Sequence, residues 1–149
     1  MKKTAEEIAQ FVTMIANVGI FAQNTVLLVR YRHAPDRQNG WFLPHDVVEP
    51  FADPDLSAAS ILSTQLGIAD TTTRLNHIES FRGNNGTWHI SLHYKTELSK
   101  IPDHAPIDSV AEYRWFPLNA LPDRSEVSHH GWALDNIQVL LEKREATSQ

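Results

Sequence analysis

The chain has 149 residues, 42% of them hydrophobic and 21% charged, with a formal net charge of -5 at pH 7. This composition is that of a globular protein and argues against a disordered, collagen-like or membrane-embedded chain, and the length suits a single domain over residues 1–149. The basic residues are scattered, which disfavours binding to a nucleic acid polymer or a membrane. Cysteine is absent, so disulfides and thiolate chemistry are excluded, and we expect a protein of the reducing cytoplasm.

Residues 1–16 predict an amphipathic N-terminal helix. Thr4 and Glu7 have the spacing of a capping box, and apolar side chains follow at helical intervals from Ile8 to Ile15. The apolar stripe of this helix would pack on the chain's own core or form a homodimer interface, and both alternatives stay open. Polar residues interrupt any signal-peptide core, at Glu6, Glu7 and Gln10, so we interpret the segment as part of the mature protein.

A β-branched and aliphatic run at residues 25–31 predicts a strand in the middle of a sheet, because a strand with one solvated face would be less apolar. A polar loop follows at residues 33–40. Asp53 then provides an N-cap and Gly67 a stop, which together predict a helix over residues 53–66. We expect the inward face of this helix to consist of Leu56, Ala59, Leu62 and Leu66.

The second half of the chain is rich in predicted strands. Strands over residues 72–81 and 87–98 are joined by a turn with an Asn-Gly pair, and a further strand is expected near residues 111–116. A final helix is predicted over residues 132–144. The 87–98 strand alternates, with Trp88, Ile90, Leu92 and Tyr94 on one face and His89, Ser91, His93 and Lys95 on the other. This order predicts an α/β or α+β domain in which a mixed β-sheet lies between helices.

Three stretches of the sequence resemble the Nudix (MutT-like) superfamily. They are Val-Leu-Leu-Val-Arg at residues 26–30, Gly-Trp-Phe-Leu-Pro at residues 40–44 with its continuation to Leu-Gly-Ile at 66–68, and Tyr-Arg-Trp-Phe-Pro at residues 113–117. The resemblance implies the Nudix fold, a mixed sheet sandwiched between helices, here with the additional N-terminal helix. It also implies that residues 53–66 form the helix of the Nudix box.

The charged positions of the Nudix box are replaced in this chain. By the resemblance, Asp46 stands in place of the box glycine, Ala52 in place of its first glutamate and Ser60 in place of its arginine. The glutamates of the box helix are replaced by Ile61, Thr64 and Gln65. In the family these glutamates hold magnesium or manganese, which needs hard anionic oxygen ligands. The degenerate box implies a protein that binds a small phosphorylated or nucleotide-like metabolite without the usual diphosphate hydrolysis.

An enzyme with a rebuilt site is the alternative. Its catalytic candidates are His45, Asp46 and Glu49, and its ligand-binding candidates are Arg30, Arg32, Trp41, Arg82, His89, His93, His129 and His130. Imidazole together with carboxylate suits manganese, iron, nickel or zinc, so a divalent ion could join several of these side chains. His89 and His93 could not share it directly, since the strand rise separates their Cβ atoms by ~13 Å.

The same residues also have simpler interpretations. Residues 89–93 could be the solvated face of a strand, and the His129-His130 pair could begin a helix. Glu79 and Glu97 are possible bases, although isolated strand carboxylates of this kind are usually found at the surface. Three functions therefore stay open. They are a small-molecule-binding protein without a tightly held metal, an enzyme with a rebuilt histidine and aspartate site, and an interaction module that dimerises through its N-terminal helix.

Overall fold

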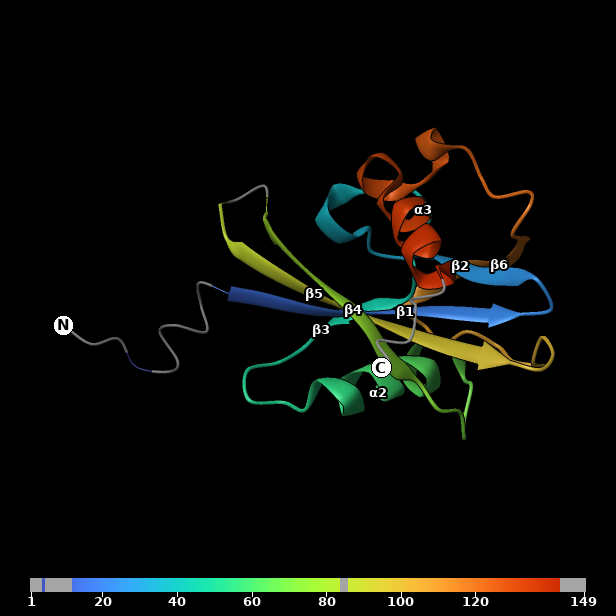
Figure 1. Ribbon diagram of the computed structural model, residues 1–149, viewed down its shortest axis with the longest axis horizontal. Coiled ribbons are helices and arrows are strands. Elements are labelled where there is room, and N and C mark those ends of the chain that lie inside the picture. Colours follow the sequence, from blue (N-terminus) through green and yellow to red (C-terminus); the bar gives the residue numbers. More distant parts are fainter. Residues whose placement is uncertain (1–3, 5–11, 84–85, 143–149) are drawn as a thin grey trace, which may run out of the picture.

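The computed structural model describes residue 4 and residues 12–83 and 86–142. A mixed sheet has the strand order β4-β5-β1-β2-β6, with β3 paired to β1, and helices α2 and α3 cover its opposite faces (Figure 1). The strands are β1 (Val12–Ala22), β2 (Thr25–Tyr31), β3 (His45–Val47), β4 (Arg74–Arg82), β5 (Trp88–Leu98) and β6 (Val110–Pro117). The helices are α2 (Pro54–Leu66), α3 (Ser128–Leu141) and the short 3-10 helices η1 (Pro35–Arg37) and η2 (Arg124–Glu126). The predicted mixed sheet between helices is confirmed.

Strand β1 corrects the prediction of an N-terminal helix. Residues 12–16 belong to this strand, which pairs in parallel with β5 from Val12 beside Trp88 to Ala22 beside Leu98. The helical spacing of apolar residues in this segment is a local signal, and pairing on both sides of β1 outweighs it. Ala16 and Val18 are fully buried as a result. Residues 5–11 lie outside the described residues, so the rest of the helix prediction stays a prediction.

Helix α2 begins and ends where the sequence predicts, although its buried face differs. The Asp53 side chain accepts a hydrogen bond from the Asp55 amide at 2.9 Å, and Gly67 ends the helix in the left-handed conformation. Leu56 is 70% exposed, contrary to the prediction, and Ala59 is exposed as well. The buried residues are Ala58, Ile61, Leu62, Gln65 and Leu66.

The hydrogen bonds of Gln65 explain the rotation of the α2 face. Its amide nitrogen donates to the His45 carbonyl at 2.7 Å, and its amide oxygen accepts from the Tyr31 hydroxyl at 2.8 Å. Satisfied hydrogen bonds allow a polar side chain to be buried at little cost. Periodicity of apolar residues therefore misplaced the inward face, because it assigned Gln65 to the solvent.

Helix α3 begins with an irregular turn. His129, His130 and Gly131 have positive φ values of 53°, 57° and 89°, so regular helical geometry starts near Trp132, where the sequence predicts it. The helix ends at Leu141, because Glu142 is extended, which corrects the prediction that it continues to residue 144. Its buried residues include Ala133, Asn136, Ile137 and Leu140, whereas Leu141 is 42% exposed.

Two apolar clusters hold the helices to the sheet. The cluster under α2 contains Val18, Leu27 and Tyr94 together with Ile61 and Leu66 of the helix. The cluster under α3 joins its buried apolar side chains to those of β2 and neighbouring segments, including Val26, Leu28, Trp41 and Phe116. No helix within the described residues is long and apolar enough to cross a membrane.

Replacing Gly67 by alanine should destabilise the protein more than the same change at Gly86. Both glycines have positive φ, 67° and 80°, and a left-handed alanine costs about 1–2 kcal/mol. A Cβ at Gly67 would also lie 2.8 Å from the Ala105 carbonyl oxygen, whereas one at Gly86 would meet no described atom within 4 Å. Urea denaturation of Gly67→Ala and Gly86→Ala measures the difference, and equal losses would contradict the close approach at Gly67.

Candidate functional site

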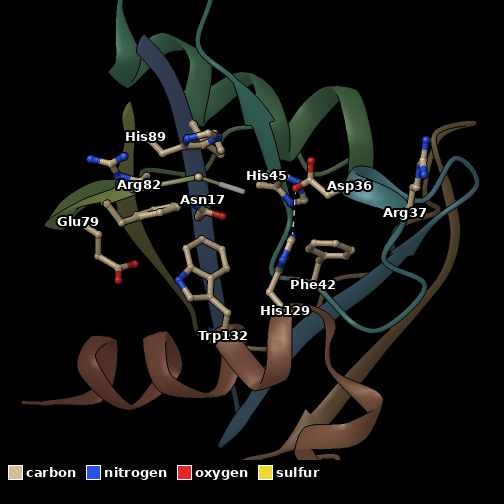
Figure 2. A pocket seen from close by; sticks show the side chains of 13 residues that line it. Asn17, Asp36, Arg37, Phe42, His45, Glu79, Arg82, His89, His129 and Trp132 are labelled. Carbon is tan, nitrogen blue, oxygen red and sulfur yellow. Dashed lines mark hydrogen bonds and ion pairs between the residues drawn. The ribbon is translucent and has the colours of Figure 1, made fainter. Parts of the chain in front are cut away.

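A cleft of about 800 Å³ lies between α3 and the neighbouring face of the sheet (Figure 2). Strands β1, β3, β4 and β5, the loop that includes η1, and the start of α3 all contribute to it. Its lining residues are Ile15, Asn17, Asp36, Arg37, Phe42, His45, Glu79, Phe81, Arg82, Gly83, His89, His129 and Trp132.

The register of the sheet brings these side chains together. Asn17 of β1 is paired with His45 of β3 on one side and with His93 of β5 on the other. Paired residues in neighbouring strands direct their side chains to the same face, and alternate residues along a strand do so too. The same face of β4 therefore carries Glu79 and Phe81.

Asn17 is the most unusual group in the cleft. Its residue is fully buried, and neither its amide nitrogen nor its amide oxygen has a hydrogen-bond partner among the described residues. The side chain points into the cleft from the middle of β1 (Figure 2). An unpaired buried amide costs about 1–3 kcal/mol, so this position disfavours folding and suits contact with a ligand.

Glu79 and His93 form a hydrogen-bonded pair beside Asn17. His93 Nε2 lies 2.6 Å from Glu79 Oε1, and the imidazole is completely buried. Residues 89–93 are therefore not a solvated face, because α3 covers this part of β5 and Trp132 packs 5.4 Å from the His93 ring. The hydrogen bond from His93 holds the pKa of Glu79 below its ordinary value, although partial burial opposes this shift.

His77 and Asn136 support the Glu79–His93 pair through further side-chain contacts. The His77 ring stacks on His93 at a centroid distance of 4.4 Å, and His77 Nε2 lies 3.2 Å from Asn136 Oδ1. The Asn136 amide nitrogen donates to the Trp132 carbonyl at 3.0 Å, and the Asn136 side chain helps to lower the pKa of Glu79. These contacts fix Glu79 from both the sheet and α3.

The other end of the cleft is closed by contacts between two loops. His129 Nε2 lies 3.2 Å from a carboxylate oxygen of Asp36 (Figure 2). The His129 amide donates to the side chain of Gln38 at 3.0 Å. Asp36 and Arg37 have positive φ values of 51° and 61°. The contacts join the loop around η1 to the start of α3, although these segments are far apart in the sequence.

His45 lies between these two ends. Its Nδ1 is 3.0 Å from the Leu43 carbonyl, and its ring packs against Phe42 and Tyr31 at centroid distances of 4.9 and 5.1 Å. Burial lowers the pKa of His45, although the contact with the Leu43 carbonyl opposes that shift. The imidazole is therefore neutral at pH 7 and can both donate and accept a hydrogen bond.

The structure brings together only some of the residues singled out from the sequence. His45, Arg82, His89 and His129 line the cleft, and His93 lies buried behind Glu79. Asp46 and Glu49 are exposed and are not among the lining residues, which corrects the expectation that Asp46 and the histidines meet in one cleft. In β3, alternation places the Asp46 side chain on the opposite face from His45.

The remaining predicted residues have contacts elsewhere. The Arg30 guanidinium stacks on Trp41 at 4.2 Å and pairs with Glu112, while Trp41 itself is buried in the cluster under α3. Arg32 donates to the Asp108 carbonyl at 2.6 Å. His130 is exposed, and its carbonyl accepts a hydrogen bond from Arg124.

Several cleft residues had been missed, namely Asn17, Phe42 and Phe81 together with Asp36 and Arg37. Asn17 had a usable signal, because it is a polar residue inside the apolar run of residues 14–22. The aromatic residues and the Asp36-Arg37 pair had no comparable signal, since their place depends on how distant segments pack.

Comparison with known proteins gives a clear result for the fold. No family model and no curated protein matches the sequence. The MutT Nudix hydrolase of Burkholderia pseudomallei, however, superposes with a TM-score of 0.66 over 89% of this chain and 98% of its own, at 19% identity. The protein has the Nudix fold.

Two further structures with the Nudix fold are similar. The Nudix domain of Shewanella oneidensis NrtR, complexed with ADP ribose, has a TM-score of 0.69 and 18% identity, with 93% of this chain and 97% of that one covered. The Escherichia coli dihydroneopterin triphosphate pyrophosphohydrolase has a TM-score of 0.61 and 15% identity, with 83% and 92% covered. At these identities the likeness concerns the fold alone.

The residues of α2 do not fit the divalent metal that proteins of this fold typically use. Ile61 is apolar and buried, the Thr64 hydroxyl donates to the Ser60 carbonyl, and the Gln65 amide is bound to β3. The only carboxylate of this helix, Asp55, accepts a hydrogen bond from Tyr94 at 2.6 Å. The described residues contain no group of three or more His, Cys, Asp or Glu side chains placed to hold a metal ion.

The neutral state of the half-buried His45 predicts an acid-dependent loss of stability. The pKa of His45 in the folded protein lies below its unfolded value of about 6.5, so the unfolded chain takes up a proton first as the pH falls. The free energy of unfolding is therefore highest above about pH 6.5 and decreases as the pH falls below that value. Urea denaturation at about pH 7.5 and about pH 5.5 should show a smaller loss for His45→Gln than for the wild type. The exposed His33 provides a control, His33→Gln, and an equal loss in both variants would refute a lowered pKa of His45 in the folded protein.

Proposed function

We propose that the cleft binds a small phosphorylated or nucleotide-like metabolite, and that the protein does so without the standard diphosphate hydrolysis of its fold. The observation that carries this proposal is Asn17, whose buried amide has no hydrogen-bond partner among the described residues. An amide offers both a donor and an acceptor, so it can meet the polar edge of a ligand at the floor of the cleft.

The lining of the cleft suits such a ligand in two further ways. Phe81 and Trp132 contribute aromatic surface on which a planar ring can stack, as aromatic groups do with favourable offset geometry. Arg37 and Arg82 line the cleft as exposed cations, which suits a phosphate group. Ligand sites in proteins usually combine apolar walls with a few placed polar groups, and this cleft has that composition.

The absence of hydrolysis is inferred from the composition of α2. Magnesium-assisted attack on a diphosphate needs anionic oxygen ligands, and the one carboxylate of α2 is held by the Tyr94 hydroxyl.

The Shewanella domain of the same fold is complexed with ADP ribose. ADP-ribose is therefore a rational first probe for this chain.

Asn17→Leu should abolish ligand binding while leaving folding intact. Isothermal titration calorimetry with ADP-ribose and guanosine monophosphate, with and without magnesium, should show binding to the wild type and at least about a tenfold loss in the variant. Chromatography of the same mixtures should show no cleaved product.

Thr96→Val is the matched control for Asn17→Leu. Thr96 is also buried, its hydroxyl also has no partner among the described residues, and it does not line the cleft. Both variants should be as stable as the wild type or more stable by about 1 kcal/mol, and only Asn17→Leu should lose the ligand. The proposal would be refuted if the wild type bound neither ADP-ribose nor guanosine monophosphate, or if both variants lost affinity equally.

A rebuilt enzyme is the second candidate, because His45, His89 and His129 line one cleft, although no three such side chains of the described residues are placed to share a metal ion. The proposal of a binding protein predicts that the untagged chain, incubated with manganese, iron, nickel or zinc and then desalted, retains no metal by mass spectrometry. Near-stoichiometric metal in the wild type and its loss in His45→Ala would overturn that proposal and favour metal-assisted chemistry.

A further inference from the structure

We propose that the end of the cleft around Glu79 recognises a planar nitrogen heterocycle that presents two adjacent N–H donors, the edge shared by guanine and by pterins. This inference rests on the proposed function, because it names the ring of the metabolite that the cleft would bind. A fixed carboxylate, aromatic surface and an unpartnered amide all line this end of the cleft, on Glu79, Trp132 and Asn17 (Figure 2).

Glu79 provides a hydrogen-bond acceptor and no donor. Its side chain is 36% exposed and lines the cleft, while Oε1 receives the short hydrogen bond from His93. An ionised carboxylate has about four acceptor positions, and the hydrogen bond from His93 occupies one of them, so acceptor positions remain for a ligand. A ligand edge with two donors satisfies the Glu79 carboxylate. An edge that carries an acceptor would instead place a lone pair of the ligand against a lone pair of the carboxylate.

His93 makes this acceptor rigid. Because the carboxylate only accepts, the proton of the hydrogen bond belongs to His93 Nε2. The His93 ring is buried and stacked on His77, so it cannot turn away without unpacking this part of β4 and β5. His93 is therefore a positioning residue, and the orientation of Glu79 is set before any ligand binds, which lowers the entropic cost of recognition.

The pattern of donors distinguishes the common heterocycles. The pairing edges of adenine and cytosine each have an amino donor beside a ring acceptor, and that of uracil has a single donor between two carbonyls. Only the guanine-type edge places an amino group next to a ring N–H. A carboxylate matches that pair of donors in the same way as it matches the two nitrogens of an arginine.

Asn17 extends this recognition along the same edge. Glu79 reaches over β5 to His93, and His93 is paired in register with Asn17 of β1, so the carboxylate and the amide stand over one short stretch of the sheet. In guanine and pterins the ring N–H is followed by a carbonyl oxygen. The free amide hydrogens of Asn17 can donate to that oxygen, which would satisfy the unpartnered group.

Phe81 and Trp132 provide the surface for the ring itself. Phe81 is 38% exposed, and its ring contacts that of Trp132 edge to face at a centroid distance of 6.4 Å. A planar ring hydrogen-bonded to Glu79 can stack on these side chains within the cleft. The affinity of the cleft for a heterocycle should therefore have two sources. Ring stacking is common to all bases, whereas the hydrogen bonds to Glu79 favour the guanine-type edge.

The experiment compares guanosine, inosine, adenosine and neopterin by isothermal titration calorimetry, with ADP-ribose as a separate probe. Inosine differs from guanosine only by lacking the amino group, so the wild type should bind guanosine, neopterin or both at least about tenfold more tightly than inosine and adenosine. Glu79→Gln should lose this preference and gain affinity for adenosine relative to guanosine, since an amide offers one acceptor and one donor.

Glu97→Gln is the control, because Glu97 is a strand carboxylate of β5 that is 72% exposed and outside the cleft. It should keep the wild-type preference, and thermal unfolding of both variants checks that they are folded. Equal binding of all four compounds, or an unchanged preference in folded Glu79→Gln, would overturn this inference while leaving the proposed function in place. No binding of any compound, ADP-ribose included, would overturn both.

Discussion

The parallel pairing of β1 with β5 is the constraint on which the cleft depends. It sets Asn17 beside His93, and the pairing of β1 with β3 then sets Asn17 beside His45. A shift of this register by one residue would turn every side chain of β1 to the other face of the sheet. Asn17 would then enter the apolar cluster under α2, and Val18 would take its place in the cleft. Burial of Ala16, Val18 and Ile20 excludes that shift.

Local chemistry was enough to predict the elements that depend on nearby residues. The aliphatic run of β2 and the Asp53 and Gly67 caps of α2 appear in the structure with the expected bounds. The prediction failed for β1, because its spacing of apolar residues satisfies a helix and only its distant partners in the sequence favour a strand. Sequence patterns report local preference, and long-range pairing can overrule it.

The candidate site was predicted in part for the same reason. Alternation along β5 correctly placed His89 and His93 on one face, but it gave no sign that α3 covers that face. Glu79 was treated as an ordinary surface carboxylate, since the sequence does not show that it lies 2.6 Å from a buried imidazole. Contacts between these strands and a helix far along the sequence are set by packing, which composition and spacing do not encode.

The residues that line the cleft are almost entirely different from those that form the two apolar clusters. Of the residues that line the cleft, only Phe42 belongs to either apolar cluster. The two apolar clusters that hold the helices to the sheet are thus made almost entirely of side chains outside the cleft. Most exchanges of polar groups in the cleft should therefore leave the protein folded, so the chemistry of the cleft lining can change by single substitutions, each of which passes through a folded protein.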